Sequence, residues 1–337
     1  MTSATTSTKE SPPILTAAAT ASLTGRLALQ GKQAARGLEW WSAEAGVALE
    51  ISDDGGSASA AAAAYGRWLD AGIDILFGPY GSGLVRSVIP LVTRAGAMLW
   101  NHGGSADDLA HPLVVPLPAP ASTYFWGAVE LAAHSGPEQI VLVVGRGLFA
   151  ASVAAGAVAA ATHIGLPVRE VPLAEARAIT AAPPVGAVMV VGRFEEDVAF
   201  VAELGADYPG LVACVAAGLL EFGERLGPAA EGVLGPVQWI PEAVTPELGP
   251  TGTEFARHYQ ATFGSPPGYV AAQAAAAGFL AAEAHRLGLK PDDVRRWRTS
   301  TLLGSFAVDK SWRQVGYTAR TVRWQGGRQV LVPRRST

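Results

Sequence analysis

The sequence predicts an α/β protein with two doubly wound, Rossmann-like lobes. Short apolar runs of strand length alternate with longer segments of helical spacing along almost the whole chain, a pattern typical of parallel sheets covered by helices. Proline residues interrupt this alternation at 113–120 and again at Pro241. The 337 residues are also too many for one ordinary core. We therefore expect two lobes, with the chain passing between them near each interruption.

The first series of elements consists of strands that alternate with helices. The predicted strands are the apolar runs 14–19, 48–52, 73–77 and 97–100. The predicted helices are 31–45, 57–70 and 84–94. Gly46 is placed to end the first helix and Ser57 to cap the second, since glycine and serine favour these positions. This order favours a parallel sheet.

A second series of the same kind follows the first interruption. Its predicted helices are 122–134, 149–164 and 195–207, and its predicted strands are 140–144, 187–191, 212–216 and 233–240. Two longer helices are then expected at 251–263 and 269–287. The segments 318–324 and 329–332 flank Gly326-Gly327 and predict a hairpin at the C-terminus.

Composition and charge exclude several classes of protein. The chain has 25 basic and 29 acidic residues and no long basic run, which argues against a nucleic-acid or anionic-membrane surface. A single cysteine, Cys214, excludes an internal disulfide and a cysteine-based zinc site. No uncharged apolar run reaches the length of about 18 residues that a membrane span needs. Residues 1–13 are polar and lack the apolar core of a secretory signal, so they predict a disordered leader and a cytoplasmic location for the chain as it stands.

Two turns rich in glycine and serine mark the candidate site. Residues 78–83 (GPYGSG) and 101–105 (NHGGS) each follow a predicted strand and precede a helix. Because the carboxyl ends of neighbouring parallel strands lie at one edge of a sheet, we expect backbone N–H groups and two hydroxyls to meet there. No nucleophile has a base beside it, so these turns indicate binding and not catalysis.

Each serine of these turns also has a purely structural interpretation. Ser105 with Asp108 matches a helix capping box, and this interpretation is as good as ligand contact. Ser82 lies between Gly81 and Gly83, a costly arrangement unless something approaches closely, so we favour ligand contact there.

The aromatic and charged candidates are likewise open to two interpretations. Trp100, Tyr124 and Trp239 are more typical of core or hinge aromatics than of ligand platforms. Arg193 follows a predicted strand end, where an unpaired charge can face a cleft, and an exposed surface position is the alternative.

One motif favours a protein of another class. Gly145-x-Gly147-x-x-Ala150 joins a predicted strand to a helix, and Glu170 lies 25 positions after Gly145, where a ribose-binding carboxylate is expected. An NAD-linked oxidoreductase is therefore the alternative. The motif is isolated, however, and the six histidines form no H-x-x-x-H pair. We expect no enzyme activity, no metal and no cofactor.

Several segments together resemble the type I periplasmic binding proteins of the branched-chain amino acid and amide group, the substrate-binding subunits of ABC transporters. The matching segments are LTG at 23–25, DD at 53–54, GPYGS at 78–82, FG at 263–264, YVAAQA at 269–274, LGSF at 303–306 and VRWQGG at 322–327. Their order and spacing carry the resemblance, which covers residues 14–333.

The resemblance implies three hinge crossings and a ligand cleft between the lobes. The first lobe would be 14–117 plus 242–315, and the second 118–241 plus 316–335. Ser82, Gly103 and Ser105 would hold the α-carboxylate of an amino acid ligand, with Tyr80 and Gly81 in the same turn.

The sequence departs from the family at three ligand positions. An aromatic residue of the first loop falls near Gln30, and a tyrosine of the second lobe falls near Arg193 or Phe194. The acidic residue that neutralises an α-ammonium falls at 216–218, where no carboxylate stands.

The implied function is a solute-binding protein that closes on an amino acid, amide, urea-like compound or small carboxylate and delivers it to an ABC permease. A cytoplasmic amide sensor acting on a regulatory protein is the second possibility within the same family. Neither interpretation implies nucleic-acid binding or membrane insertion.

Overall fold

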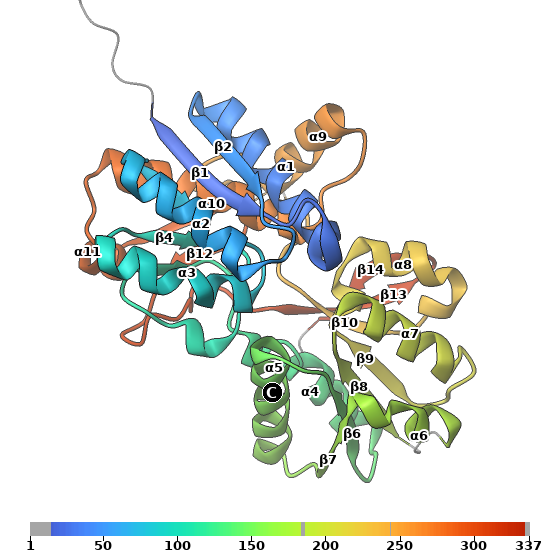
Figure 1. Cartoon of the computed structure of the whole chain (residues 1–337). Coiled ribbons are helices and arrows are strands. Elements are labelled where there is room, and N and C mark those ends of the chain that lie inside the picture. The colour runs from blue at the N-terminus through green and yellow to red at the C-terminus, as the bar shows by residue number, and fades with distance from the viewer. Residues whose placement is uncertain (1–14, 183–185, 243, 334–337) are drawn as a thin grey trace, which may run out of the picture.

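The computed structural model describes residues 15–182, 186–242 and 244–333, so the predicted leader lies outside the described residues. Two large sheets lie in separate regions of the molecule, the first at the upper left and the second at the lower right of Figure 1. A small antiparallel pair, β11 (Arg298–Thr301) and β12 (Gly304–Ala307), completes the strands. The α/β fold class predicted from the sequence is confirmed.

The first sheet is parallel and has the order β2-β1-β3-β4-β5. Its strands are β1 (Thr16–Ala21), β2 (Ala48–Asp53), β3 (Ile75–Phe77), β4 (Leu99–Asn101) and β5 (Val114–Pro116). The connecting helices are α1 (Ala28–Ala45), α2 (Ala58–Ala71) and α3 (Ser82–Ala95). Gly46 ends α1 in the left-handed conformation, and the Ser57 hydroxyl caps α2, both as predicted. The strand β5 was not expected, because prolines surround its short apolar run.

The second sheet has the order β14-β13-β10-β9-β8-β6-β7. Its parallel strands are β6 (Ile140–Val144), β7 (Val168–Pro172), β8 (Ala187–Val191), β9 (Leu211–Cys214) and β10 (Leu234–Val237). The predicted hairpin forms the antiparallel edge as β13 (Arg320–Gln325) and β14 (Arg328–Leu331). The helices of this region are α4 (Trp126–Ser135), α5 (Leu148–His163), α6 (Ala176–Ala181), α7 (Phe194–Leu204) and α8 (Leu220–Leu226).

Short 3-10 turns join several of these elements. They are η1 (Gly25–Leu27), η2 (Asp107–Leu109), η3 (Ala121–Thr123), η4 (Leu173–Glu175), η5 (Ala216–Gly218) and η6 (Gly227–Ala230).

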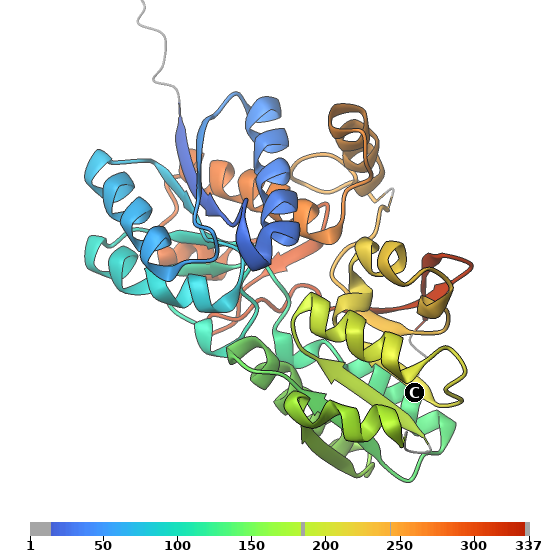
Figure 2. The ribbon, with the colours of Figure 1, turned by 45° about the vertical axis from the view of Figure 1, so that its right-hand side comes forward.

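Three later helices belong to the first region, where the orange segment lies beside the blue N-terminal elements in Figures 1 and 2. They are α9 (Gly252–Phe263), α10 (Tyr269–Arg286) and α11 (Pro291–Arg296). Glycines bring α1 and α10 together: a Cβ at Gly37 would lie 2.3 Å from the Ala271 carbonyl oxygen, and one at Gly278 would meet the Trp41 ring. The alanine-rich α10 is therefore a buried packing helix, and no helix among the described residues is long and apolar enough to cross a membrane.

The chain passes between the two regions three times: after β5, after β10 and before β13. The two regions also share buried side chains. Leu219, Val237 and Val322 of the second region belong to the core cluster of the first, and Phe194 packs against core clusters of both. The exact lobe boundaries stay predictions.

Candidate functional site

The two glycine-serine turns lie side by side at the carboxyl ends of β3 and β4. The Gly81 amide donates to the Gly103 carbonyl at 3.1 Å. Ser82 is buried, and its hydroxyl accepts a hydrogen bond of 3.1 Å from the Ala106 amide. Gly81 has φ +108°, a conformation that favours glycine. The hydroxyl of Ser82 thus joins the two turns.

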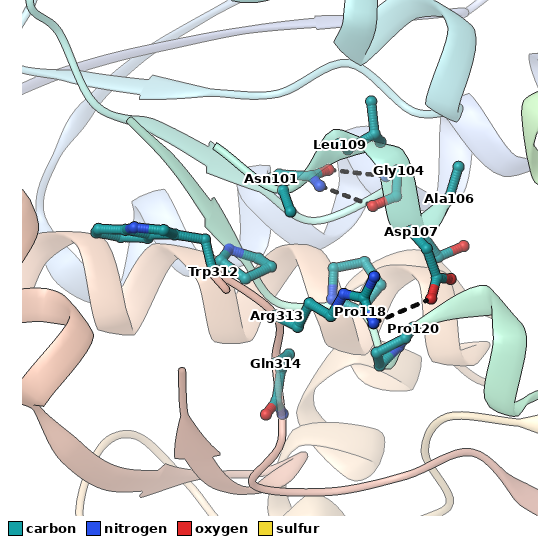
Figure 3. Close-up of a pocket in the computed structure, with 13 residues that line it drawn as sticks. Asn101, Gly104, Ala106, Asp107, Leu109, Pro118, Pro120, Trp312, Arg313 and Gln314 are labelled. Atoms are coloured by element: carbon teal, nitrogen blue, oxygen red, sulfur yellow. Dashed lines mark hydrogen bonds and ion pairs between the residues drawn. The ribbon is translucent and has the colours of Figure 1, made fainter. Parts of the chain in front are cut away.

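Gly103 and Asn101 shape the second turn from within. A Cβ at Gly103 would lie 2.7 Å from Tyr80 Cα, so only glycine lets the turn approach Tyr80 this closely. The Asn101 side chain donates to the Gly104 carbonyl at 2.7 Å and accepts from the Gly104 amide at 2.8 Å (Figure 3). Neutral groups therefore hold the turns after β3 and β4.

Ser105 makes a contact different from its predicted capping box. Residues after it form η2, whose N-cap is Ala106, and Asp108 pairs with Arg86 instead of reaching back. The capping box was wrong because the turn continues as a short 3-10 segment. The Ser105 hydroxyl accepts a hydrogen bond of 3.1 Å from Tyr124, which in turn accepts one from Gln238.

Tyr124 is consequently a buried link between the regions, with its ring edge-to-face against Phe149 at 5.5 Å. Trp100 and Trp239 both belong to the core of the first region, in agreement with the core interpretation. Burial raises the pKa of the Tyr80 and Tyr124 phenols well above the ordinary range, so both stay neutral donors and acceptors.

Figure 3 shows a small pocket of about 30 Å³ behind the second turn, lined by residues that include Asn101, Gly104 and Gln314. Its volume suits about one water molecule. Asp107 at its rim accepts hydrogen bonds from the Ser122 amide and hydroxyl, and lies 3.9 Å from the Arg313 guanidinium. The pocket therefore lies among the contacts that hold the chain where it passes between the regions after β5.

Arg193 and Phe194, the two candidates after β8, have different environments. The Arg193 side chain is exposed and pairs with Glu196 within the first turn of α7. Its exposed position matches the surface interpretation. Phe194 is half-buried and lies between the core clusters of the two regions.

Asp197 is a buried polar residue between the loops after β8 and β9 that sequence reasoning missed. Its carboxylate accepts hydrogen bonds from the Gly192 amide at 2.7 Å and the Ala216 amide at 3.0 Å, and only 1% of its surface is exposed. It therefore joins the loops after β8 and β9. Burial raises the pKa of this carboxyl to about 7. An aspartate inside a helix carries no local signal of such partners.

A second missed group lies where α1 of the first region meets α8 of the second. Gln33 donates its side-chain amide to the Glu221 carboxylate. The remaining Gln33 and Glu221 oxygens are buried without a partner, as is the side-chain oxygen of Gln30. Burial raises the pKa of Glu221. No carboxylate stands at 216–218, as the sequence states, but Glu221 lies just beyond on the next helix.

The dinucleotide-like motif has the predicted strand-turn-helix context but lacks its acidic residue. Gly145 follows β6 and Gly147 precedes α5 with φ +108°. Glu170 pairs in register with Leu142 within the sheet, and so lies away from the carboxyl end where a ribose would bind.

Comparisons with solved structures show the same fold over nearly the whole chain. A leucine-binding protein from Thermotoga maritima has a TM-score of 0.82 at 16% identity, covering 95% of this chain and 98% of that one. A solute-binding protein of an ABC transporter from Rhodopseudomonas palustris BisB5, in complex with 3,4-dihydroxybenzoic acid, has a TM-score of 0.80 at 16% identity and covers 94% and 95%. A substrate-binding protein from Desulfitobacterium hafniense in complex with leucine has a TM-score of 0.75 at 17% identity and covers 95% and 99%.

The search of curated protein sequences found no match. A family model described as periplasmic binding protein matches residues 15–296, most of the chain. The chain belongs to the periplasmic binding protein family, with the type I two-lobed fold.

Proposed function

We propose that this protein is the solute-binding subunit of an ABC importer and closes its two lobes on one small polar ligand. The observation that carries the proposal is the contact between α1 and α8, where Gln33 of the first region bonds Glu221 of the second and one side-chain oxygen of each stays buried without a partner. A ligand that contacts both regions binds the closed arrangement more tightly than the open one, and this difference in affinity is what favours closure. The ligand would be an amino acid, amide, urea-like compound or small carboxylate.

The hydroxyls of Ser82 and Ser105 supply the second part of the proposed site. Each already accepts a hydrogen bond within the protein, yet each retains its own O–H to donate. A carboxylate or carbonyl oxygen of a ligand needs such donors. Hydrogen bonds to a charged group contribute roughly 1.5–3 kcal/mol each, so a few of them suffice for micromolar binding after the cost of association.

The solved structures described above as transport proteins favour an ABC permease as the partner. No finding favours a regulatory protein in this role. The family is one of periplasmic proteins, and the cytoplasmic location stays a prediction that cell fractionation of the full chain checks.

The test is a thermal-shift screen followed by titration calorimetry. Leucine, benzoate, 3,4-dihydroxybenzoate, acetamide and urea form the first panel, extended to the other amino acids. At least one compound should raise Tm, since ligand at 100 times its Kd stabilises the folded state by about 2.7 kcal/mol. Hydride transfer from NADH to any substrate would instead favour the oxidoreductase.

A further inference from the structure

A larger cavity than the pocket of Figure 3 lies in the first region, at the edge of the sheet opposite the glycine-serine turns. It has a volume of about 290 Å³ and lies beside the amino-terminal ends of β3 and β4, where α10 leads to α11 (Figure 1). An engineered apolar cavity of about 150 Å³ is enough to bind benzene, and typical sites for small molecules begin near about 300 Å³. The cavity is therefore large enough for a molecule built on a single ring.

The interior of this cavity is lined by apolar side chains. Trp100, Ala281 and Ala284 are buried residues of the lining, and Met98 and Leu289 are half-buried. The two alanines lie three positions apart on α10, so they share one face of the helix, and their small side chains leave space in front of Trp100. The lining therefore suits an apolar molecular body.

The turn after α10 places polar groups at the mouth of the cavity. Gly288, with φ +64°, turns the chain at the end of the helix. The Leu289 amide donates to the Ala284 carbonyl at 2.9 Å, and the Gly288 amide donates to the His285 carbonyl at 3.0 Å. These bonds satisfy carbonyls at the end of α10. The exposed polar residues that this turn adds to the lining are His285 and Lys290.

The two basic residues at the mouth lack an anionic partner. Among the residues that the structure describes, neither His285 nor Lys290 forms an ion pair. Asp293 lies close enough to sense the Lys290 charge, but its carboxylate pairs with Arg296 at 2.8 Å. The Lys290 ammonium is therefore available to an anion in the cavity.

Asp74, the carboxylate of the lining, is already bonded to the protein. It accepts hydrogen bonds of 2.9 and 2.7 Å from the Thr16 amide and hydroxyl. These bonds, with a smaller effect of the nearby His285, lower the pKa of Asp74, so it stays ionised and partly neutralises His285. Lys290 is consequently the main cation that a ligand would meet.

We propose that this cavity binds a small monocarboxylate whose apolar body is about one aromatic ring in size, such as an arylacetate. The ring would lie against Trp100 and the two alanines, and the carboxylate would meet Lys290 and His285 at the mouth. A cation would meet like charges there, and a neutral molecule would gain only the apolar contacts. Because Ser82 follows the opposite end of β3, the cavity is separate from the proposed ligand cleft, and this inference does not depend on the proposed function.

The methionines of the chain provide a reporter for the cavity. Met98 lines it, Met189 is fully buried in β8 of the second sheet, and Met1 is the third. In protein with isotope-labelled methionine methyl groups, phenylacetate should shift the Met98 NMR signal in a saturable way, with a Kd in the millimolar range or tighter, and leave Met189 unshifted. Met98→Leu identifies the signal. A probe in the cleft would not contact Met98, so this titration reports the cavity.

Matched probes and variants test the chemistry of the mouth. Phenethyl alcohol and phenethylamine share the ring of phenylacetate, and each should bind at least about threefold more weakly. Lys290→Gln should weaken phenylacetate binding by about three- to fivefold and leave phenethyl alcohol unchanged. Arg286→Gln removes an exposed charge at the same end of α10 but outside the lining, so it is the matched control and should leave both affinities unchanged.

Filling the cavity tests its location. Ala284→Leu should abolish the phenylacetate shift of Met98 without lowering Tm, because the added side chain enters open space. Ala281→Leu, one turn earlier, is a second variant of this kind. An unchanged Met189 signal shows that each variant keeps its fold.

Three results would overturn the inference. If phenylacetate at about ten millimolar leaves the Met98 signal unshifted, the cavity takes no such ligand. If phenethylamine binds as tightly as phenylacetate, the assigned chemistry is wrong. If both alanine variants keep the full shift, the probe binds elsewhere. None of these results bears on the proposed function, which the screen for ligands of the cleft tests separately.

Discussion

The loops after β3 and β4 in the first region and the loops after β8 and β9 in the second are braced by different chemistry. Neutral groups join the first pair of loops: the Ser82 hydroxyl accepts from the Ala106 amide, and the Asn101 side-chain amide holds Gly104. In the second region, a buried carboxylate, Asp197, accepts from the amides of Gly192 and Ala216. The hydroxyl and amide contacts of the first pair involve no titrating group, whereas the contacts of the second pair change with protonation of Asp197. These two pairs of loops therefore differ in what can loosen them.

The largest effect on stability is expected from removal of the Asp197 carboxyl group. Asp197→Ala leaves two inward-facing amides without an acceptor, and should lower the free energy of unfolding by about 2–5 kcal/mol. Urea denaturation measures the loss. Asp207→Ala, an exposed position beyond the same helix, is the control and should stay within about 0.5 kcal/mol of wild type. Equal stability of the two variants would contradict the role assigned to Asp197.

The pH dependence should follow from the same carboxyl. The unfolded chain releases this proton near the ordinary pKa of 3.8, whereas the folded protein holds it to a pKa of about 7. Between about pH 4 and 7 the folded state binds the extra proton, so this group makes the free energy of unfolding fall as pH rises, by up to about 1.4 kcal/mol per pH unit. Above about pH 7 the contribution levels off.

Comparison of the wild-type protein with Asp197→Asn isolates the contribution of the Asp197 carboxyl to the pH dependence of stability. His102 acts in the opposite sense, because burial lowers its pKa to about 4 and acid then disfavours the fold. Wild type and variant both contain His102, so its contribution cancels when one profile of stability against pH is subtracted from the other. The free energy of unfolding of the wild-type protein relative to that of the variant should fall steadily as pH rises from about 4 to 7. A difference that is constant with pH would show that Asp197 ionises normally in the folded protein.

Removal of the Ser82 hydroxyl should give an intermediate loss in the free energy of unfolding. Ser82→Ala removes the acceptor of the buried Ala106 amide. It should lower the free energy of unfolding by about 1–3 kcal/mol at every pH between about 5 and 8. Ser87→Ala, on the same helix, removes only a hydroxyl bonded to the Leu84 carbonyl and should cost much less. A marked pH dependence of the Ser82→Ala loss would break the contrast between the two pairs of loops.

The smallest effect is expected at Arg193. Its side chain is exposed and pairs with Glu196, so Arg193→Ala should change the free energy of unfolding by about 0.5 kcal/mol or less. The same variant should bind the compounds found by the thermal-shift screen as the wild-type protein does. A loss of affinity would restore Arg193 as a ligand contact.

The sequence predicts the alternation of strands and helices because most strands are unbroken apolar runs. Ile140–Val144 and Ala187–Val191 are buried on both faces and have the predicted bounds. Val168–Pro172 was missed because it is an edge strand with exposed polar residues. A strand that only one neighbour covers has no need of a continuous apolar run.

The site was predicted less fully for a physical reason. The turns holding Ser82 and Ser105 are local features, so their position could be inferred. Their partners, Ala106 and Tyr124, depend on how separate segments pack. Glu221 and Gln33 lie 188 positions apart in the sequence, and the residues around each give no indication of its partner.

The single cysteine of the chain has a practical consequence. Cys214 at the end of β9 is fully buried, and burial raises its thiol pKa well above the ordinary value, so little reactive thiolate exists in the folded protein. A cysteine introduced on an exposed helix would therefore be labelled selectively, without first removing the native one. Modification of Cys214 itself would require the second sheet to open, so its slow reaction with a thiol reagent would time that opening in an unlabelled protein.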